Sequence, residues 1–98
     1  MTDEQLARNL KSVGQSCFVK YFALFASWAD GANVVEVLKS QNSFTENSCR
    51  SRTSHARSII RAGMTKTALQ KVISSNSPRV SEATRAKAAE ILNSHPDG

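Results

Sequence analysis

Residues 47–62, with the sequence NSCRSRTSHARSIIRA, are the stretch that decides the fold of this chain. Cys49, Thr53, Ala56 and Ile60 recur at steps of four, three and four residues. This repeat is typical of one face of an α-helix, because 3.6 residues make one turn. We therefore predict a helix over residues 47–62 that turns this small, apolar face toward the core.

The opposite face of the predicted helix is basic. It carries Arg50, Ser54, Arg57 and Arg61. Arginine binds phosphates and guanine edges through paired N–H groups, and short hydroxyls add phosphate contacts. Charge runs are most often solvated helix faces, but exposed helices usually intersperse Glu with Arg, and residues 47–62 contain none. The pattern therefore favours a surface that binds an anionic partner.

The charges of the whole chain are unevenly divided. Its 98 residues hold 13 Lys and Arg against 8 Asp and Glu, a formal net charge of +5. Residues 1–46 carry four basic and five acidic side chains, whereas residues 47–81 carry seven basic ones and no acid. All six aromatic residues lie before residue 47. We expect one domain, residues 1–98, with an aromatic core and dimerisation half at 1–46, a basic half at 47–93 and a tail at 94–98.

Composition excludes several classes of protein. At 40% hydrophobic and 21% charged residues, the chain resembles a folded soluble domain. The longest apolar run, residues 17–29, contains Lys20 and is shorter than the ~20 residues of a membrane-spanning helix. The first residues are acidic, unlike a signal peptide. Cys17 and Cys49 lack ligand spacing, so we expect buried thiols in a reducing cytoplasm, with no metal, no cofactor and no membrane partner.

Two helices are predicted within residues 2–28, in the aromatic half of the chain. Residues 2–5 can form a capping box, and Leu6, Leu10 and Val13 follow at helical spacing. Gly14 is a candidate break, after which Ser16 caps a second helix over residues 17–28.

The second of these helices is apolar nearly all round. Phe18, Phe22 and Phe25 line one of its faces. A helix of this kind must be covered on every side, so these three rings belong either to the core or to a homodimer interface. Both placements stay open on the sequence, and we assign the three rings to the candidate dimer interface.

Five further signals place the remaining elements. Asn33 can cap a short helix over residues 34–38, and residues 41–47 read as a loop. Gly63 suits the end of the basic helix, Thr65 can cap a helix over residues 66–75, and Ser81 can start the last helix. The predicted fold is all-α, with five to six short helices that contain a helix-turn-helix.

A catalytic site is hard to build from these residues. The chain has two histidines, His55 and His95. Cys49 and His55 are six residues apart on one predicted helix, which is roughly 240° around it, so they cannot form a nucleophile and base pair. We predict that the protein is not an enzyme.

Two placements of the helix-turn-helix are possible. In one, residues 34–40 support and the arginine-rich helix enters the major groove of DNA. In the other, residues 54–62 support, Gly63 marks the turn and residues 66–75 read the groove. The first has the more basic reading helix, and the second has the shorter turn.

The second placement is strengthened by a resemblance. Residues 65–73, TKTALQKVI, and 76–85, NSPRVSEATR, resemble the helix-turn-helix headpiece of lactose-repressor-type transcriptional regulators. The resemblance spans residues 65–93. It implies that Lys66 and Thr67, at the start of a recognition helix, read bases, and that Lys71 matches a position usually held by a contacting Arg. The resemblance implies no effector ligand.

Together these features predict a small sequence-specific double-stranded DNA-binding protein, a transcription regulator of the repressor kind that acts as a homodimer. The alternative is a protein-interaction module that docks its basic face on an acidic partner protein. Recognition of RNA or single strands is less favoured, because the basic half has no aromatic side chain for base stacking. The candidate DNA-binding residues are Arg50, Arg52, Ser54, Arg57, Arg61, Lys66, Thr67, Gln70, Lys71 and Arg79.

Overall fold

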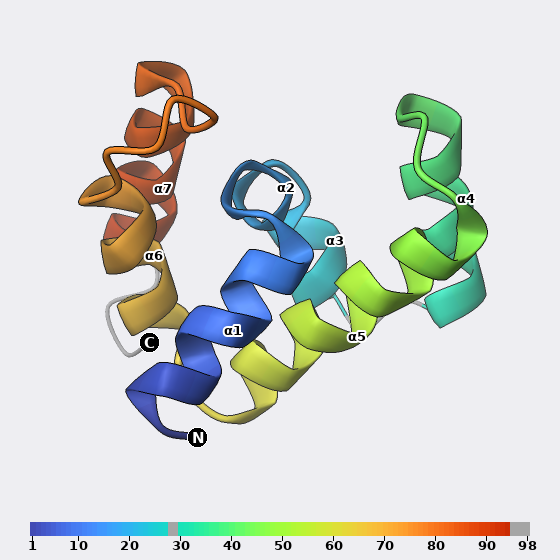
Figure 1. Cartoon of the computed structure of the whole chain (residues 1–98), viewed down its shortest axis with the longest axis horizontal. Coiled ribbons are helices and arrows are strands. Elements are labelled where there is room, and N and C mark those ends of the chain that lie inside the picture. Colours follow the sequence, from blue (N-terminus) through green and yellow to red (C-terminus); the bar gives the residue numbers. More distant parts are fainter. Residues whose placement is uncertain (28–29, 95–98) are drawn as a thin grey trace.

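Seven α-helices make up the computed structural model of the chain, which describes residues 1–27 and 30–94 (Figure 1). They are α1 (Asp3–Val13), α2 (Gln15–Lys20), α3 (Phe22–Ala26), α4 (Gly31–Gln41), α5 (Glu46–Arg61), α6 (Thr65–Ile73) and α7 (Glu82–Ser94). The residues described contain no strand. The predicted all-α class is therefore confirmed, with more helices than the five or six expected.

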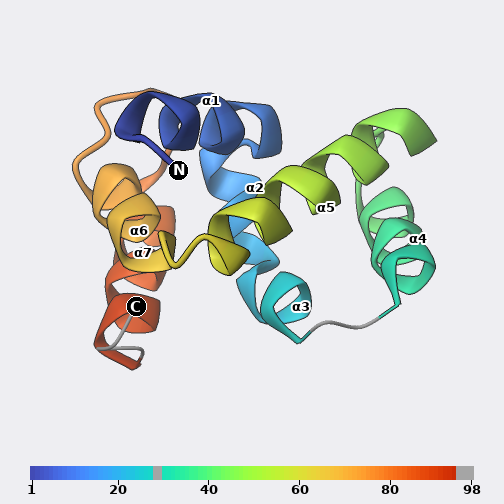
Figure 2. The same cartoon turned by 90° about the horizontal axis from the view of Figure 1, so that it is seen from below.

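The longest helix, α5, lies between the other elements. Helix α1 packs along it, α4 packs near its first turns, and α3 also contacts it. Helices α6 and α7 pair with each other at the opposite end of the molecule from α4, as both views show (Figures 1 and 2). Helix α5 therefore joins two ends of the molecule that do not pack on each other.

The additional helix arises because the predicted helix over residues 17–28 is divided. Helix α2 begins at Gln15, directly after Gly14, so Ser16 is not its cap. Tyr21 separates α2 from α3 with φ −108° and ψ 18°, away from helical ψ values. The expected end of this helix at Trp28 lies outside the described residues. The division bends the aromatic segment, so its rings pack on more than one neighbouring helix.

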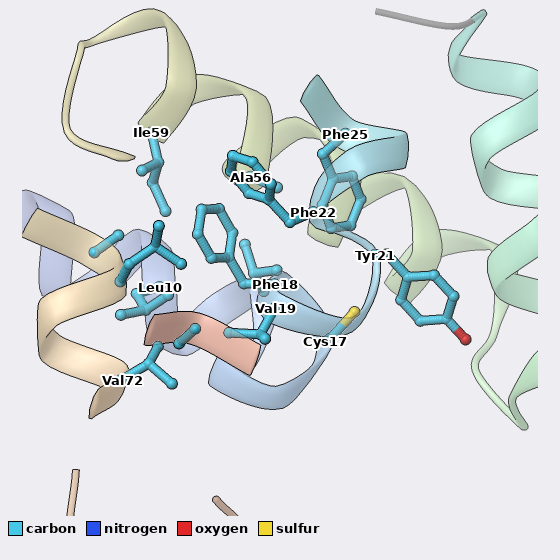
Figure 3. Close-up of a cluster of buried hydrophobic side chains, with 14 of the residues drawn as sticks. Leu10, Cys17, Phe18, Val19, Tyr21, Phe22, Phe25, Ala56, Ile59 and Val72 are labelled. Atoms are coloured by element: carbon cyan, nitrogen blue, oxygen red, sulfur yellow. The ribbon is translucent and has the colours of Figure 1, made fainter. Parts of the chain in front are cut away.

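The aromatic rings of this segment are buried in the core of the single chain (Figure 3). Phe18, Phe22 and Phe25 expose 0%, 6% and 0% of their surface. The rings of Phe18 and Phe22 meet edge to face, with their centroids 5.7 Å apart. Side chains with so little accessible surface offer little area to a second copy. The three rings therefore serve the core, which is one of the two placements that the sequence left open, and a homodimer would need a further surface.

The core is completed by the apolar faces of the flanking helices. Leu6, Leu10 and Val13 of α1 are buried, as their spacing predicts. On α5 the buried residues are Cys49, Thr53, Ala56 and Ile59. Ile59 is fully buried, and the predicted Ile60 is half-buried and packs against the core, so both residues contribute at the end of this face. None of the helices in the described part of the chain has the length and hydropathy of a bilayer-spanning segment.

The helix caps agree with the sequence signals in part. Thr2 and Gln5 form the predicted capping box at the start of α1. Helix α4, however, is capped by Asp30, whose carboxylate accepts a hydrogen bond from the Ala32 amide at 3.1 Å, and not by Asn33. Each of these side chains satisfies an amide that the helix itself leaves unpaired.

The two threonines at the connections on either side of α5 differ in their roles. Thr45 caps α5 by accepting from the Ser48 amide. Thr65, predicted as the cap of the next helix, is instead the first residue of α6 and is buried.

The connections before and after α5 are both short. Residues 42–45 join α4 to α5, which is shorter than the predicted loop over 41–47. Residues 62–64 join α5 to α6, and Gly63 adopts φ +71°, as its position predicts. The two predicted helix-turn-helix placements therefore correspond to α4 with α5 and to α5 with α6, and each pair is joined by a short connection.

Candidate nucleic-acid interface

The ten candidate DNA-binding residues lie on three separate surfaces. The first, which we name the α5 arginine row, comprises Arg50, Ser54, Arg57 and Arg61. The second, the α6 face, comprises Lys66, Thr67 and Gln70. The remaining three, Arg52, Lys71 and Arg79, line a cavity among α1, α2, α5 and α6, which we name the central groove.

The α5 arginine row lines a cavity of about 480 Å³ between α4 and α5. Glu36 of α4 and Glu46 of α5 line it as well. Glu46 lies 3.3 Å from the Arg50 guanidinium and 3.7 Å from the Lys39 ammonium. The stretch without acids begins one residue after Glu46, so the sequence interpretation missed this partner. The positive charge of Arg50 therefore has a carboxylate beside it. An exposed ion pair of this kind contributes at most about 1 kcal/mol to the stability of the fold.

Arg57 has a structural contact in addition to its place in the row. Its Nε donates a hydrogen bond to the backbone carbonyl of Phe25 at 3.3 Å, which ties α5 to α3. The side chain is half-buried, whereas Arg61, one turn further along, is exposed. Arg61 therefore has the more accessible guanidinium of the two.

Arg52 is engaged within the fold. One Nη donates to the carbonyl of Val13, and Nε donates to the Ser48 hydroxyl at 3.1 Å. The guanidinium carbon lies 3.8 Å from the centre of the Phe44 ring, a cation–π contact. Arg52 thus joins the end of α1, the loop before α5 and α5 itself. The structure places it away from the α6 face and the α5 arginine row.

Gly14 makes the Arg52 contact possible. It has φ +89°, and a Cβ on this residue would lie 2.9 Å from Arg52 Nη1. Glycine adopts this backbone conformation without the steric penalty of an L side chain. The local sequence Val13-Gly14 therefore presents a carbonyl and an open space to the arginine.

The central groove has a volume of about 880 Å³ and is lined from α1, α2, α5, α6 and the connection between α6 and α7. Its cationic residues are Lys11, Lys20, Arg52, Lys71 and Arg79. No carboxylate is among the residues that line it. Sequence reasoning missed Lys11 and Lys20, because they belong to the half of the chain that is neutral overall. No spacing signal could have found them, since packing alone brings them beside Lys71.

Cys17 also lines the central groove. Burial raises the pKa of its thiol above the ordinary value, while the nearby Arg52 guanidinium acts in the opposite direction. Cys49 is fully buried, and His55 Nδ1 lies 2.7 Å from the carbonyl of Ser51. Within residues 1–27 and 30–94, no group of three or more His, Cys, Asp or Glu side chains is placed to hold a metal.

The α6 face points away from the core. Lys66 and Gln70 are exposed and Thr67 is half-buried, while Ala68, Leu69 and Val72 face inward. Helix α7 packs on α6, and Arg85 of α7 donates two hydrogen bonds to the carbonyl of Ser75, at 3.0 and 2.8 Å. These bonds fix the connection that follows α6.

Neither family models, curated proteins nor solved structures match this chain. Its own residues therefore carry the functional inference.

Proposed function

We propose that the chain is a small sequence-specific double-stranded DNA-binding protein, a transcription regulator that acts as a homodimer. The observation that carries the proposal is the α6 face. It belongs to a nine-residue helix without a carboxylate, which lies at one end of the molecule and exposes a lysine and a glutamine. A short, basic, accessible helix after a tight turn is the usual reading element of a helix-turn-helix.

In this proposal α5 is the supporting helix of the helix-turn-helix, and α6 is the recognition helix that enters the major groove. The three-residue connection 62–64, with Gly63 at positive φ, has the length of such a turn. The first residues of a recognition helix contact base edges, which assigns base contacts to Lys66 and Thr67. Gln70, one turn later, has the carboxamide that pairs with adenine. The resemblance of residues 65–93 to lactose-repressor-type headpieces supports the same roles.

The alternative reading helix, α5, has α4 beside its basic face. Helix α4 and the α5 arginine row line one cavity, which Glu36 and Glu46 also line, so α4 and its carboxylate stand between this face and a groove about 12 Å wide. We therefore assign phosphate contacts to the α5 arginine row, and above all to Arg61. It is exposed at the end of α5, next to the turn that leads to α6.

A salt titration of duplex binding tests the proposal. Because each phosphate contact releases counterions, the logarithm of the affinity should fall linearly with the logarithm of salt concentration. Fluorescence anisotropy with a labelled random 20-bp duplex measures this slope. Absence of duplex binding even at 50 mM salt contradicts the proposal.

Variants that remove equal charge from different surfaces test whether the α6 face binds the duplex. Lys66→Gln/Arg61→Gln should weaken duplex binding at least tenfold and reduce the salt slope by about 1, because Arg61 is assigned to a phosphate and Lys66 to base edges. Arg8→Gln/Lys87→Gln is the control, because it removes the same charge from exposed residues of α1 and α7. Equal losses in both variants would show that binding depends on net charge and not on the α6 face.

A protein-interaction module remains the second candidate, since the α5 arginine row lines a cavity with α4 that an acidic peptide could enter. Saturable binding of a polyglutamate peptide together with no duplex binding would favour it. Sensitivity of that binding to Arg50→Gln/Arg57→Gln would place the peptide in this cavity.

The homodimer is a separate part of the proposal. Because Phe18, Phe22 and Phe25 are buried, it requires another surface. Sedimentation velocity measures the oligomeric state of the free protein and of its complex with the duplex. A strict monomer in both would contradict dimeric action and leave DNA binding by a single copy.

A further inference from the structure

The central groove brings together cations from distant parts of the chain. Lys11 and Lys20 come from the first two helices, Arg52 from α5, Lys71 from α6, and Arg79 from the connection that follows α6. No Asp or Glu is among the residues that line the groove. We propose that the central groove is a binding site for a small organic phosphate with at least two negative charges.

The charge of the groove accounts for the net charge of the protein. Five of the 13 Lys and Arg line it, and the other eight are matched in number by the 8 Asp and Glu. The formal excess of +5 thus equals the charge of this one cavity. Like charges gathered in a concave site repel one another and focus a positive potential. A multivalent anion would relieve this repulsion.

The groove has a fixed part and an adjustable part. Arg52 is held by Val13, Ser48 and the Phe44 ring, so its charge is fixed at the wall of the groove. Lys11, Lys20 and Arg79 are exposed, and Lys71 is half-buried. These long side chains can approach a ligand from several sides.

The number of cations around the groove favours phosphate over carboxylate. A phosphate ester group carries about −1.5 to −2 charges at pH 7 and three acceptor oxygens, and lysine binds phosphate as a point charge. The guanidinium of Arg52 already donates to protein atoms, and three of the other four cations are lysines.

The size and walls of the groove suit an organic molecule. Ligand sites for small molecules measure about 300–1,000 Å³, and this cavity of about 880 Å³ falls within that range. Leu10, Tyr21, Phe44 and Val80 supply apolar and aromatic wall. Gln15, which also lines it, has a buried Oε1 without a donor among the described residues. A ligand hydroxyl could pair with this acceptor once the side chain turns toward it.

The site is distinct from the α6 face, so this proposal does not depend on DNA binding. Lys66 and Lys71 are five positions apart on α6, which places them about 140° apart around the helix. Lys71 lines the groove, and Lys66 does not.

Isothermal titration calorimetry with sodium pyrophosphate, at constant ionic strength, tests the site on the full chain without DNA. We expect one saturable site per chain. Lys71→Gln/Arg79→Gln should weaken pyrophosphate binding at least tenfold, whereas Arg8→Gln/Lys87→Gln, which removes equal charge from exposed residues outside the groove, should change it less than twofold. Circular dichroism checks that each variant folds.

Amide chemical shifts provide a second readout that does not rely on variants. Pyrophosphate should shift the amides of Gly14, Gln15 and Ser16, which line the groove, more than those of residues 65–70. No saturable binding to the folded wild type overturns the proposal, as does equal weakening in both double variants. Loss of duplex binding without loss of pyrophosphate binding in Lys71→Gln/Arg79→Gln would show that these two residues serve the DNA backbone instead.

Discussion

At the residue scale, Arg52 shows how a candidate identified from a pattern can belong to the fold. On the sequence it is one of four arginines in residues 47–62, and its spacing places it about 200° around the helix from Arg50, off the basic face. In the structure its donors reach the Val13 carbonyl and the Ser48 hydroxyl. Partners 39 residues away in the chain are set by tertiary packing, so local periodicity could not reveal them.

Gly14 is the residue on which this contact depends, and its substitution should be costly. Gly14→Ala places a side chain at φ +89° and a Cβ 2.9 Å from Arg52 Nη1, so we expect a loss of about 1–3 kcal/mol in the free energy of unfolding. Urea unfolding followed by circular dichroism measures it.

Gly31→Ala is the matched control for this substitution. A Cβ at Gly31 meets no atom within 4 Å, and replacing glycine without strain stabilises a protein by up to about 1 kcal/mol. Equal effects of the two substitutions would contradict the role assigned to the Gly14 backbone.

At the element scale, the sequence predicted where helices lie better than where they begin. The capping box of α1, the positive φ of Gly63 and the inward face of α5 through Cys49, Thr53 and Ala56 agree with the structure. The break at Tyr21 does not follow from composition, since residues 17–25 contain no proline or glycine. Packing of the aromatic rings on several neighbours overrides the local helical preference there.

The start of α5 offers a test at this scale. Thr45→Ala removes the hydroxyl that accepts from the Ser48 amide, so stability should fall by about 0.5–2 kcal/mol. Thr45→Ser keeps the hydroxyl and should stay within about 0.5 kcal/mol of the wild type. Thermal unfolding monitored at 222 nm compares them. A Thr45→Ser variant as weak as Thr45→Ala would point to the lost methyl group instead of the cap.

At the scale of the whole molecule, the distribution of charge differs from the sequence interpretation. The linear division into a neutral half and a basic half is correct as a count, but packing brings Lys11 and Lys20 of the first half beside Lys71 and Arg79 of the second. The α5 arginine row, in contrast, faces Glu36 and Glu46. A count along the chain cannot predict which charges a fold brings together.

Repulsion within the central groove predicts that salt stabilises the protein. Between 0.01 and 0.1 M salt the Debye length falls from about 30 Å to about 10 Å. We expect the melting temperature to rise by about 4–8 °C, the equivalent of about 1 kcal/mol for a chain of this size. Lys71→Gln/Arg79→Gln should remove most of this rise, whereas Lys66→Gln/Arg61→Gln should keep it. The same salt dependence in both variants would place the repulsion outside the groove.

The packing of α1 along α5 also bears on how the protein is made. Helix α1 ends at Val13, but the helix that covers its apolar face is complete only at Arg61. During synthesis on the ribosome, the first helix therefore emerges long before its partner. Leu6, Leu10 and Val13, all buried in the finished protein, stay exposed while about 50 further residues are added at about 5–20 residues per second. For several seconds the nascent chain therefore exposes an apolar surface that the finished protein buries, and such surface is prone to aggregation until α5 covers it.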